Sequence, residues 1–186
     1  MHHIYTTEAF VIHSAPQGEA GKFLLLFTKD FGMIGVMAQG IRLIKSKLRH
    51  HVQDYSYCMV SIVRGKEVWR LTGASEIKNY DLKQKEILHI KILKLLRRLL
   101  QGEEKNEKLF EIINELYRME IKKEDIDTIE YIIVLRILNN LGYISNLNFK
   151  EILNNNEISE NIISKAINQK SFIIKAINLA LQESQL

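Results

Sequence analysis

The residue pattern changes near residue 80, and this change limits the chain to folds that join two unlike parts. Before it, short apolar and β-branched runs alternate with turn residues. From Leu82 onward the apolar residues have helical spacing, interrupted by glycine only at Gly102 and Gly142. The charge divides in the same way, because residues 1–80 hold 10 Lys and Arg against 6 Asp and Glu, whereas residues 81–186 hold 16 against 16. We therefore expect one domain over residues 1–80 and a second over residues 81–186.

The residue pattern of residues 1–80 predicts five short strands separated by turns. Gly32 follows an aspartate and a phenylalanine at a position where a positive φ suits a tight turn. Five strands in so short a segment fit a small closed barrel, of which the oligonucleotide-binding (OB) type is one common solution. The predicted fold is therefore α+β, with an N-terminal five-stranded OB-fold barrel followed by an all-α helical bundle. The expected strands are residues 7–13, 22–28, 33–38, 55–63 and 68–72, with a break over residues 15–21.

The second part predicts a series of helices delimited by capping residues. A first helix is expected over residues 84–101 and a second from about Asn106. The third is apolar almost all round over residues 129–138, which is typical of the central helix of a bundle. Several residues suggest further helix ends: Asp127 with Glu130 as a capping box, Gly142 as a stop, and Ser159 and Ser171 as N-caps.

A run of cations lies between the third and fourth expected strands. No acidic residue occurs between Asp30 and Asp54 to compensate it. Closely spaced Lys and Arg gain free energy by releasing the counterions of a polyanion, so the run is typical of a phosphate-binding loop. A solvated loop that keeps the protein soluble is the alternative. The segment holds Arg42, Lys45, Ser46, Lys47 and Arg49.

Further cations and aromatic residues flank this run. Exposed aromatic side chains beside cations can stack on bases while phosphates are neutralised. The alternative is that they fill the barrel, since barrel strands bury alternate residues. The cations are Arg64, Lys66 and Arg70, and the aromatic residues are Tyr55, Tyr57 and Trp69.

The first helix is basic along one face. Lys91, Lys94 and Arg98 have the 3 and 4 spacing that places side chains on one side of a helix. Such a face could meet an acidic peptide, a nucleic acid or a membrane surface, or it could simply be solvated. Arg136 is a single cation inside the apolar third helix, so we expect it to be paired or exposed at a groove.

The sequence argues against a disulfide, a cysteine-based zinc site, a nucleotide-binding P-loop and the common catalytic motifs. Cys58 is the only cysteine, so neither an intramolecular disulfide nor a cysteine-based zinc site can form. Gly40 and Lys45 have part of a P-loop spacing, but Ile44 occupies the position of its second glycine. No catalytic motif, metal site or cofactor site is found, and we expect a non-enzymatic protein. The N-terminus resembles no signal peptide and no apolar run is long enough to span a membrane, so we expect a cytoplasmic protein.

The same residues carry a family resemblance. The segments 17–32 and 38–49, Gln53, and the run 68–72 resemble the N-terminal domain of the bacterial RecO family of recombination-mediator and DNA-repair proteins. The likeness extends through most of residues 5–76. Further on, the run from Leu135 to Tyr143 is similar to that family's central helix in the C-terminal domain.

The resemblance implies a nucleoid-associated protein with an OB barrel that binds single- and double-stranded DNA. It also implies annealing of complementary strands, exchange of single-strand-binding protein for the recombinase, and partnership with RecR. Arg42, Lys45, Ser46 and Arg49 match the family's DNA-contacting loop. Arg136, with the basic face of the first helix, matches the region that receives the acidic tail of single-strand-binding protein.

The chain also departs from the family. Many members carry a four-cysteine zinc module after the Leu-Gly-Tyr motif, where this chain has residues 145–149 and no cysteine. No zinc is therefore expected. Because composition does not separate DNA from RNA, an RNA-binding OB module stays an alternative, as does a structural adaptor for an acidic protein partner.

Overall fold

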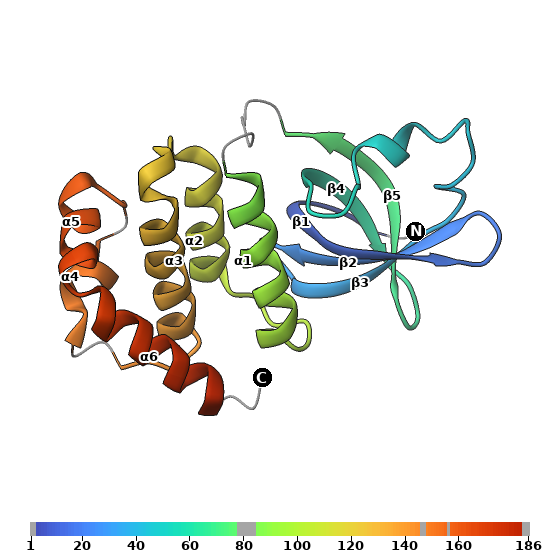
Figure 1. Ribbon diagram of the computed structural model, residues 1–186. Coiled ribbons are helices and arrows are strands. Elements are labelled where there is room, and N and C mark those ends of the chain that lie inside the picture. Colours follow the sequence, from blue (N-terminus) through green and yellow to red (C-terminus); the bar gives the residue numbers. More distant parts are fainter. Residues whose placement is uncertain (1–2, 78–84, 146–147, 156, 184–186) are drawn as a thin grey trace. The chain divides into compact units, whose positions relative to one another are not determined.

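The computed structural model describes residues 3–77, 85–145, 148–155 and 157–183 (Figure 1). The chain divides into two compact units. The first joins the N-terminal strands to residues 93–110, and the second joins residues up to 92 of the first helix to the chain from residue 111 onward. The first unit is built on a barrel and the second on helices, so the predicted α+β class is confirmed.

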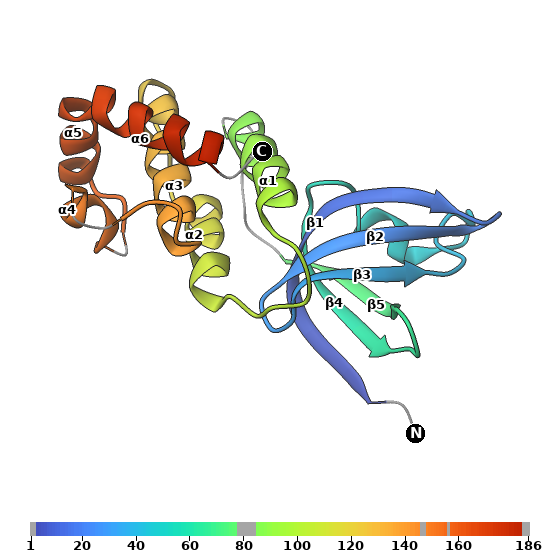
Figure 2. The same cartoon turned by 90° about the horizontal axis from the view of Figure 1, so that it is seen from below.

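The five strands form a closed barrel (Figure 2). Their order is β1-β2-β3-β5-β4, and β4 pairs again with β1. All neighbours are antiparallel except β3 and β5, which run parallel. This arrangement confirms the predicted OB-like barrel. The strands are β1 (Ile4–Gln17), β2 (Gly21–Thr28), β3 (Gly32–Ala38), β4 (Tyr57–Arg64) and β5 (Trp69–Glu76).

Alternate residues of the strands fill the barrel, as the period of two requires. The core includes Val11 of β1, Leu24 and Leu26 of β2, and Ile34 and Val36 of β3, and each of these side chains is 0% exposed. Cys58, Val60 and Ile62 of β4 complete it from the other side. The interior is therefore a packed hydrophobic core.

The first strand is longer than predicted. The expected break over residues 15–21 is wrong at its start, because β1 continues through Pro16 to Gln17. Proline has no N–H to donate, so it fits a strand only where one edge needs no partner. Here β4 pairs only with Ile4–Phe10 of β1, and Pro16 pairs on one side alone, with Lys22.

Two helices contribute to the first unit. α1 (Glu86–Leu99) and α2 (Glu107–Arg118) agree with the predicted positions, and Asn106 caps α2 because its Oδ1 accepts the Leu109 N–H at 2.9 Å. The ring of Phe110, in the first turn of α2, lies 5.0 Å from that of Phe10 and 5.6 Å from that of Phe27. These aromatic contacts cover the outer side of β1 and β2.

The second unit surrounds α3 (Ile126–Asn140). This helix follows a short 3-10 turn, η2 (Lys123–Asp125), and it buries most of its length. It packs against α4 (Lys150–Leu153), α5 (Glu160–Asn168) and α6 (Lys170–Glu183). The prediction of a central apolar helix is confirmed. Gly142 ends it, as predicted, with φ +84°.

Two of the predicted helix starts are wrong. α3 begins at Ile126 after Asp125, so Asp127 already lies in its first turn and cannot form the capping box. Ser171 lies inside α6, because only Gln169 separates α5 from Lys170 and leaves no room for a cap. Ser159 does occupy the N-cap position of α5, although its side chain makes no capping hydrogen bond.

Candidate nucleic-acid interface

The cationic run forms the connection between β3 and β4, here called the β3–β4 loop (residues 39–56). Its apolar residues fasten it to the barrel. Ile41 is 2% exposed and Val52 is 1% exposed, and both belong to the barrel core, against which Leu48 also packs. On the return side, the Tyr55 N–H donates to the Val11 carbonyl at 2.7 Å. The loop is therefore held to the barrel at both of its ends.

Between these anchors the backbone makes consecutive tight turns. Gly40 has φ +65°, which favours glycine, and its carbonyl accepts the Leu43 N–H at 3.1 Å. The Leu43 carbonyl then accepts the Ser46 N–H at 2.9 Å, and the 3-10 turn η1 (Lys47–His50) follows. The Arg42 N–H donates to the Ala20 carbonyl at 2.9 Å, which fixes the loop beside the β1–β2 hairpin (Figure 1).

The four cations of the loop are uncompensated. Arg42, Lys45 and Lys47 are exposed, and Arg49 is half-buried, as is Ser46. Among the residues that the structure describes, none of the four cations lies within ion-pair distance of a carboxylate. Uncompensated, exposed cations on a fixed backbone produce a positive potential suited to an anion such as phosphate.

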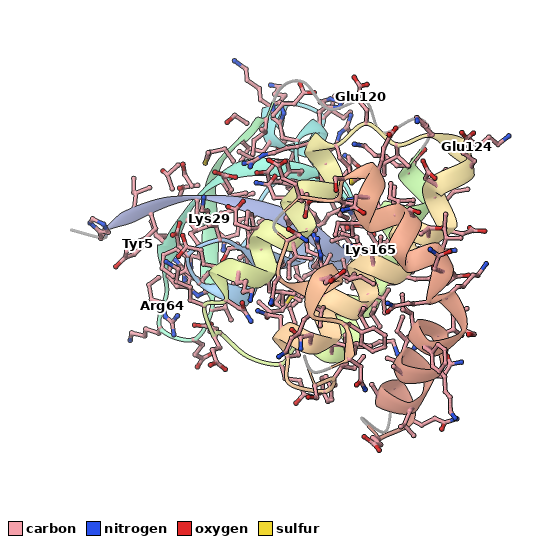
Figure 3. The ribbon with its side chains drawn as sticks, turned by 90° about the vertical axis from the view of Figure 1, so that its left-hand side faces the viewer. Tyr5, Lys29, Arg64, Glu120, Glu124 and Lys165 are labelled. Atoms are coloured by element: carbon pink, nitrogen blue, oxygen red, sulfur yellow. The ribbon has the colours of Figure 1, made fainter. Side chains whose placement is uncertain are left out.

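The cations of the β4–β5 turn have different surroundings. Arg64, labelled in Figure 3, pairs with Glu103. Its guanidinium lies 4.8 Å from the centre of the Trp69 ring. Lys66 and Arg70 are exposed, and neither has an ion pair within the described part of the chain. Arg70 pairs in register with Met37, close to the end of β3 where the β3–β4 loop begins. The barrel thus places Arg70 near the loop and leaves Arg64 engaged elsewhere.

Two of the three aromatic residues proposed for base stacking, Tyr57 and Trp69, fill the protein interior. Trp69 is 4% exposed and packs against Tyr5, and Tyr57 is 8% exposed and stacks on Phe10 with ring centres 4.5 Å apart. The interpretation of both as core residues is confirmed. Tyr55 is half-buried with φ 67°, and the Lys94 ammonium lies 5.9 Å from its ring centre.

The outer face of β2 and β3 is a feature that the sequence prediction missed. Leu24 and Leu26 point into the barrel, so Phe23 and Leu25 lie on the opposite face of β2. The Phe23 ring covers Gly35, where an added Cβ would meet its Cζ at 2.6 Å. OB barrels bind ligands on the face of strands 2 and 3. The signal was present in the sequence, because apolar residues occupy both faces of β2.

The cations predicted for partner binding lie on two helices, three of them on α1 and Arg136 on α3. Lys91, Lys94 and Arg98 are exposed on α1, but Lys91 belongs to the second unit and the other two to the first. The Lys91 ammonium donates to Glu130 Oε2 at 2.7 Å, and this hydrogen bond raises the pKa of Lys91.

Arg136 is buried and paired, the first of the two outcomes expected for it. Its side chain is 5% exposed and donates through Nη1 to Glu115 Oε2 at 2.8 Å. Nη2 donates to the Asn155 carbonyl at 2.6 Å, and Nε donates to the Ile152 carbonyl. Burial raises the pKa of Glu115 and lowers that of Arg136, and the ion pair opposes both changes. The guanidinium therefore joins α3 to α2, to α4 and to the segment after α4.

The described residues hold neither a reactive thiol nor a cluster of metal ligands. Burial raises the pKa of the Cys58 thiol to about 12, so the thiolate is scarcely formed at neutral pH. In the same residues, no group of three His, Cys, Asp or Glu side chains is placed to hold a metal ion. None of the described helices combines the length and apolar character needed to cross a bilayer.

The fold defines a class of protein in which an OB-like barrel is followed by a helical part. Comparison with known proteins narrows this class. The family described as "Recombination protein O N terminal" matches residues 1–80. DNA repair protein RecO of Dehalococcoides mccartyi strain 195 is 36% identical over 78 residues, which is 42% of this chain and 31% of that protein.

Two further relatives extend the match beyond the barrel. DNA repair protein RecO of Alkaliphilus metalliredigens is 30% identical over 126 residues, 65% of this chain and 50% of the relative. That of Thermodesulfovibrio yellowstonii is 30% identical over 151 residues, 75% of this chain and 58% of the relative. The chain belongs to the RecO family. The matched regions span between 31% and 58% of the length of these curated relatives.

Proposed function

We propose that the chain is a non-enzymatic DNA repair and recombination mediator. It binds single- and double-stranded DNA, anneals complementary strands, and helps to exchange single-strand-binding protein for the recombinase, working on the nucleoid in the cytoplasm. One observation carries the proposal: four uncompensated cations lie on a loop that is fixed to an OB-like barrel of the RecO family.

The chemistry of this proposal needs no covalent step. Cations on the β3–β4 loop neutralise phosphates and so lower the repulsion between two DNA strands. Lys66 and Arg70 extend the positive surface, and Arg64 contributes only if Glu103 releases it. The outer face of β2 and β3 offers apolar surface to bases, which stay available for pairing.

Partner binding is assigned to the cations of the helices. RecR and the acidic tail of single-strand-binding protein are the partners proposed from the family. Lys94 and Arg98 are exposed and able to meet a tail, and Lys91 can do so in exchange for Glu130. Arg136 takes part only if its pair with Glu115 opens.

The salt dependence of DNA binding tests the loop. Changing Arg42, Lys45, Lys47 and Arg49 together to Gln should flatten the slope of log K against log salt by about 3, at roughly 0.7 per single-strand phosphate. The control carries Gln at four exposed lysines elsewhere, Lys108, Lys123, Lys150 and Lys175, and should leave the slope unchanged. A loop variant with the wild-type slope would remove the loop from the binding site.

Annealing tests the mediator activity. Complementary DNA strands coated with single-strand-binding protein should anneal faster with the chain than without it. No acceleration would contradict the proposal, and tighter binding to RNA than to DNA of the same sequence would favour an RNA-binding module. The partner assignment is tested by binding to an acidic tail peptide, which should weaken when the exposed cations Lys91, Lys94 and Arg98 are replaced by Gln. Retained binding would place the tail elsewhere.

A further inference from the structure

Two apolar side chains stand exposed at the tip of the β3–β4 loop. Leu43 is 56% exposed and Ile44 is 91% exposed. They directly follow Arg42 and directly precede Lys45, both of which are exposed. Ile44 lies at the second position of the turn that the Ser46 N–H closes onto the Leu43 carbonyl. The turn therefore presents leucine and isoleucine to solvent between two cations.

Packing against the barrel does not explain why Leu43 and Ile44 occupy this turn. The loop is already fixed by Ile41 and Val52, which are almost fully buried in the core. Tight turns favour Asn, Asp, Ser, Gly and Pro, and a β-branched residue has no advantage there. Exposed apolar residues that occur singly are ordinary. Two adjacent ones at a turn, flanked by uncompensated cations, fit a ligand that has apolar surface beside anionic groups.

We propose that Leu43 and Ile44 form an apolar wedge that inserts between adjacent bases of a DNA strand. Arg42 and Lys45 then hold the phosphates on either side of the opened step. Inserted leucine and isoleucine side chains are known to unstack base steps in this way. The inference rests on the proposed function, and it names the preferred form of the ligand. The wedge favours a single strand, or the junction between single and double strand, because unstacking costs least there.

A bilayer surface also combines apolar and anionic groups. Proteins that lie in the interface usually bury the whole apolar face of an amphipathic helix, whereas here two side chains project from a turn. The small apolar tip fits the gap of one base step better than a membrane. The wedge therefore fits DNA, and lipid binding is the alternative outcome of the test.

The test uses the full chain and oligonucleotides that carry 2-aminopurine, whose fluorescence rises when the base unstacks. The wild type should raise the fluorescence of a single strand and of a junction more than that of a perfect duplex. Ile44→Ser should abolish most of the rise and weaken binding roughly tenfold. Ile44→Phe should retain both the fluorescence rise and the wild-type affinity. Ile87→Ser, which alters a 74% exposed isoleucine on α1, is the matched control and should behave as the wild type.

The slope of log K against log salt distinguishes a failure of the wedge from a failure of the proposed function. Ile44→Ser keeps every charge, so its slope should equal that of the wild type. If Ile44→Ser unstacks the base as well as the wild type does, with an intact slope, the wedge is overturned and DNA binding by the loop stands. If the wild type does not bind DNA, both fail. Ile44-dependent binding to phosphatidylglycerol vesicles, with unchanged 2-aminopurine fluorescence, would also overturn the wedge.

Discussion

At the scale of single residues, the buried pair of Arg136 and Glu115 is the most demanding feature of the helical unit. Arg136 is 5% exposed and Glu115 is 19% exposed, so both charged groups lose most of their water. Each depends on the other, on two backbone carbonyls and on one backbone amide for hydrogen bonds. Glu115 also accepts the Ile158 N–H, at 2.8 Å. The pair joins residues that are far apart in sequence, and it therefore specifies how these segments pack.

Removing one partner should cost more than removing both. Arg136→Met leaves the Glu115 carboxylate buried without its cation, and we expect the free energy of unfolding to fall by about 3 to 5 kcal/mol in urea denaturation at neutral pH. Glu115→Gln with Arg136→Met should lose less, because no buried charge is left. An Arg136→Met variant as stable as the wild type would contradict this account.

The same variant should show a defined pH dependence. Burial raises the pKa of folded Glu115 above its unfolded value, and without Arg136 the Ile158 N–H is the main group left to oppose that effect. The folded state then binds the proton more tightly than the unfolded state does. Relative to the wild type, the variant should regain stability as pH falls through the window between the two pKa values.

At the scale of elements, the start of α2 depends on a single side chain. Asn106 Oδ1 accepts the Leu109 N–H, which has no partner inside the helix. Asn106→Ala should lower the free energy of unfolding by about 1 kcal/mol, and Asn106→Asp should restore it. Ser159 occupies the same position before α5 but makes no side-chain capping bond. Ser159→Ala is therefore the control, and a cost equal to that of Asn106→Ala would argue against capping as the cause.

The elements show what local pattern can predict. The five strands follow from alternation and turn residues, and α3 follows from an apolar run ended by Gly142. The predicted break near Pro16 was wrong because the freedom of one strand edge depends on how far β4 reaches along β1. That is information about pairing, which no local window contains.

In the candidate site, too, some features follow from local sequence and others depend on contacts between distant residues. The β3–β4 loop was predicted because charge density and its place between strands are local properties. The burial of Trp69 depends on Tyr5 and Phe31, and the pairing of Arg136 depends on Glu115, all distant in sequence. The exposure of Ile44 belongs to this second group, since it follows from where the turn projects.

At the scale of the whole molecule, the barrel depends on residues that lie well beyond its last strand. Phe110 packs against Phe10, Phe27 and Tyr57, so a residue of α2 completes the packing of the strands. Phe110→Ala should lower the free energy of unfolding by about 3 to 5 kcal/mol.

The reactivity of the Cys58 thiol shows whether the loss of stability in Phe110→Ala extends to the barrel. It is fully buried, so it reacts with a thiol reagent only when the barrel opens. Labelling should be faster in Phe110→Ala than in the wild type. Ile167→Ala, which truncates an exposed residue of α5, should label as slowly as the wild type. An unchanged rate in Phe110→Ala would mean that the strands hold together without α2.

The parallel ladder between β3 and β5 has its own consequence. It contains two register pairs, Val36 with Trp69 and Met37 with Arg70, against seven pairs between β2 and β3. The barrel is thus closed by its shortest ladder, and the β3–β4 loop begins two residues after Met37, at the end of β3. Thermal breathing should begin at this closure, and its amides should exchange with deuterium sooner than those between β2 and β3. A DNA strand that binds both Arg70 and the β3–β4 loop would bridge β5 and the end of β3. It should therefore slow the exchange of the amides between these two strands.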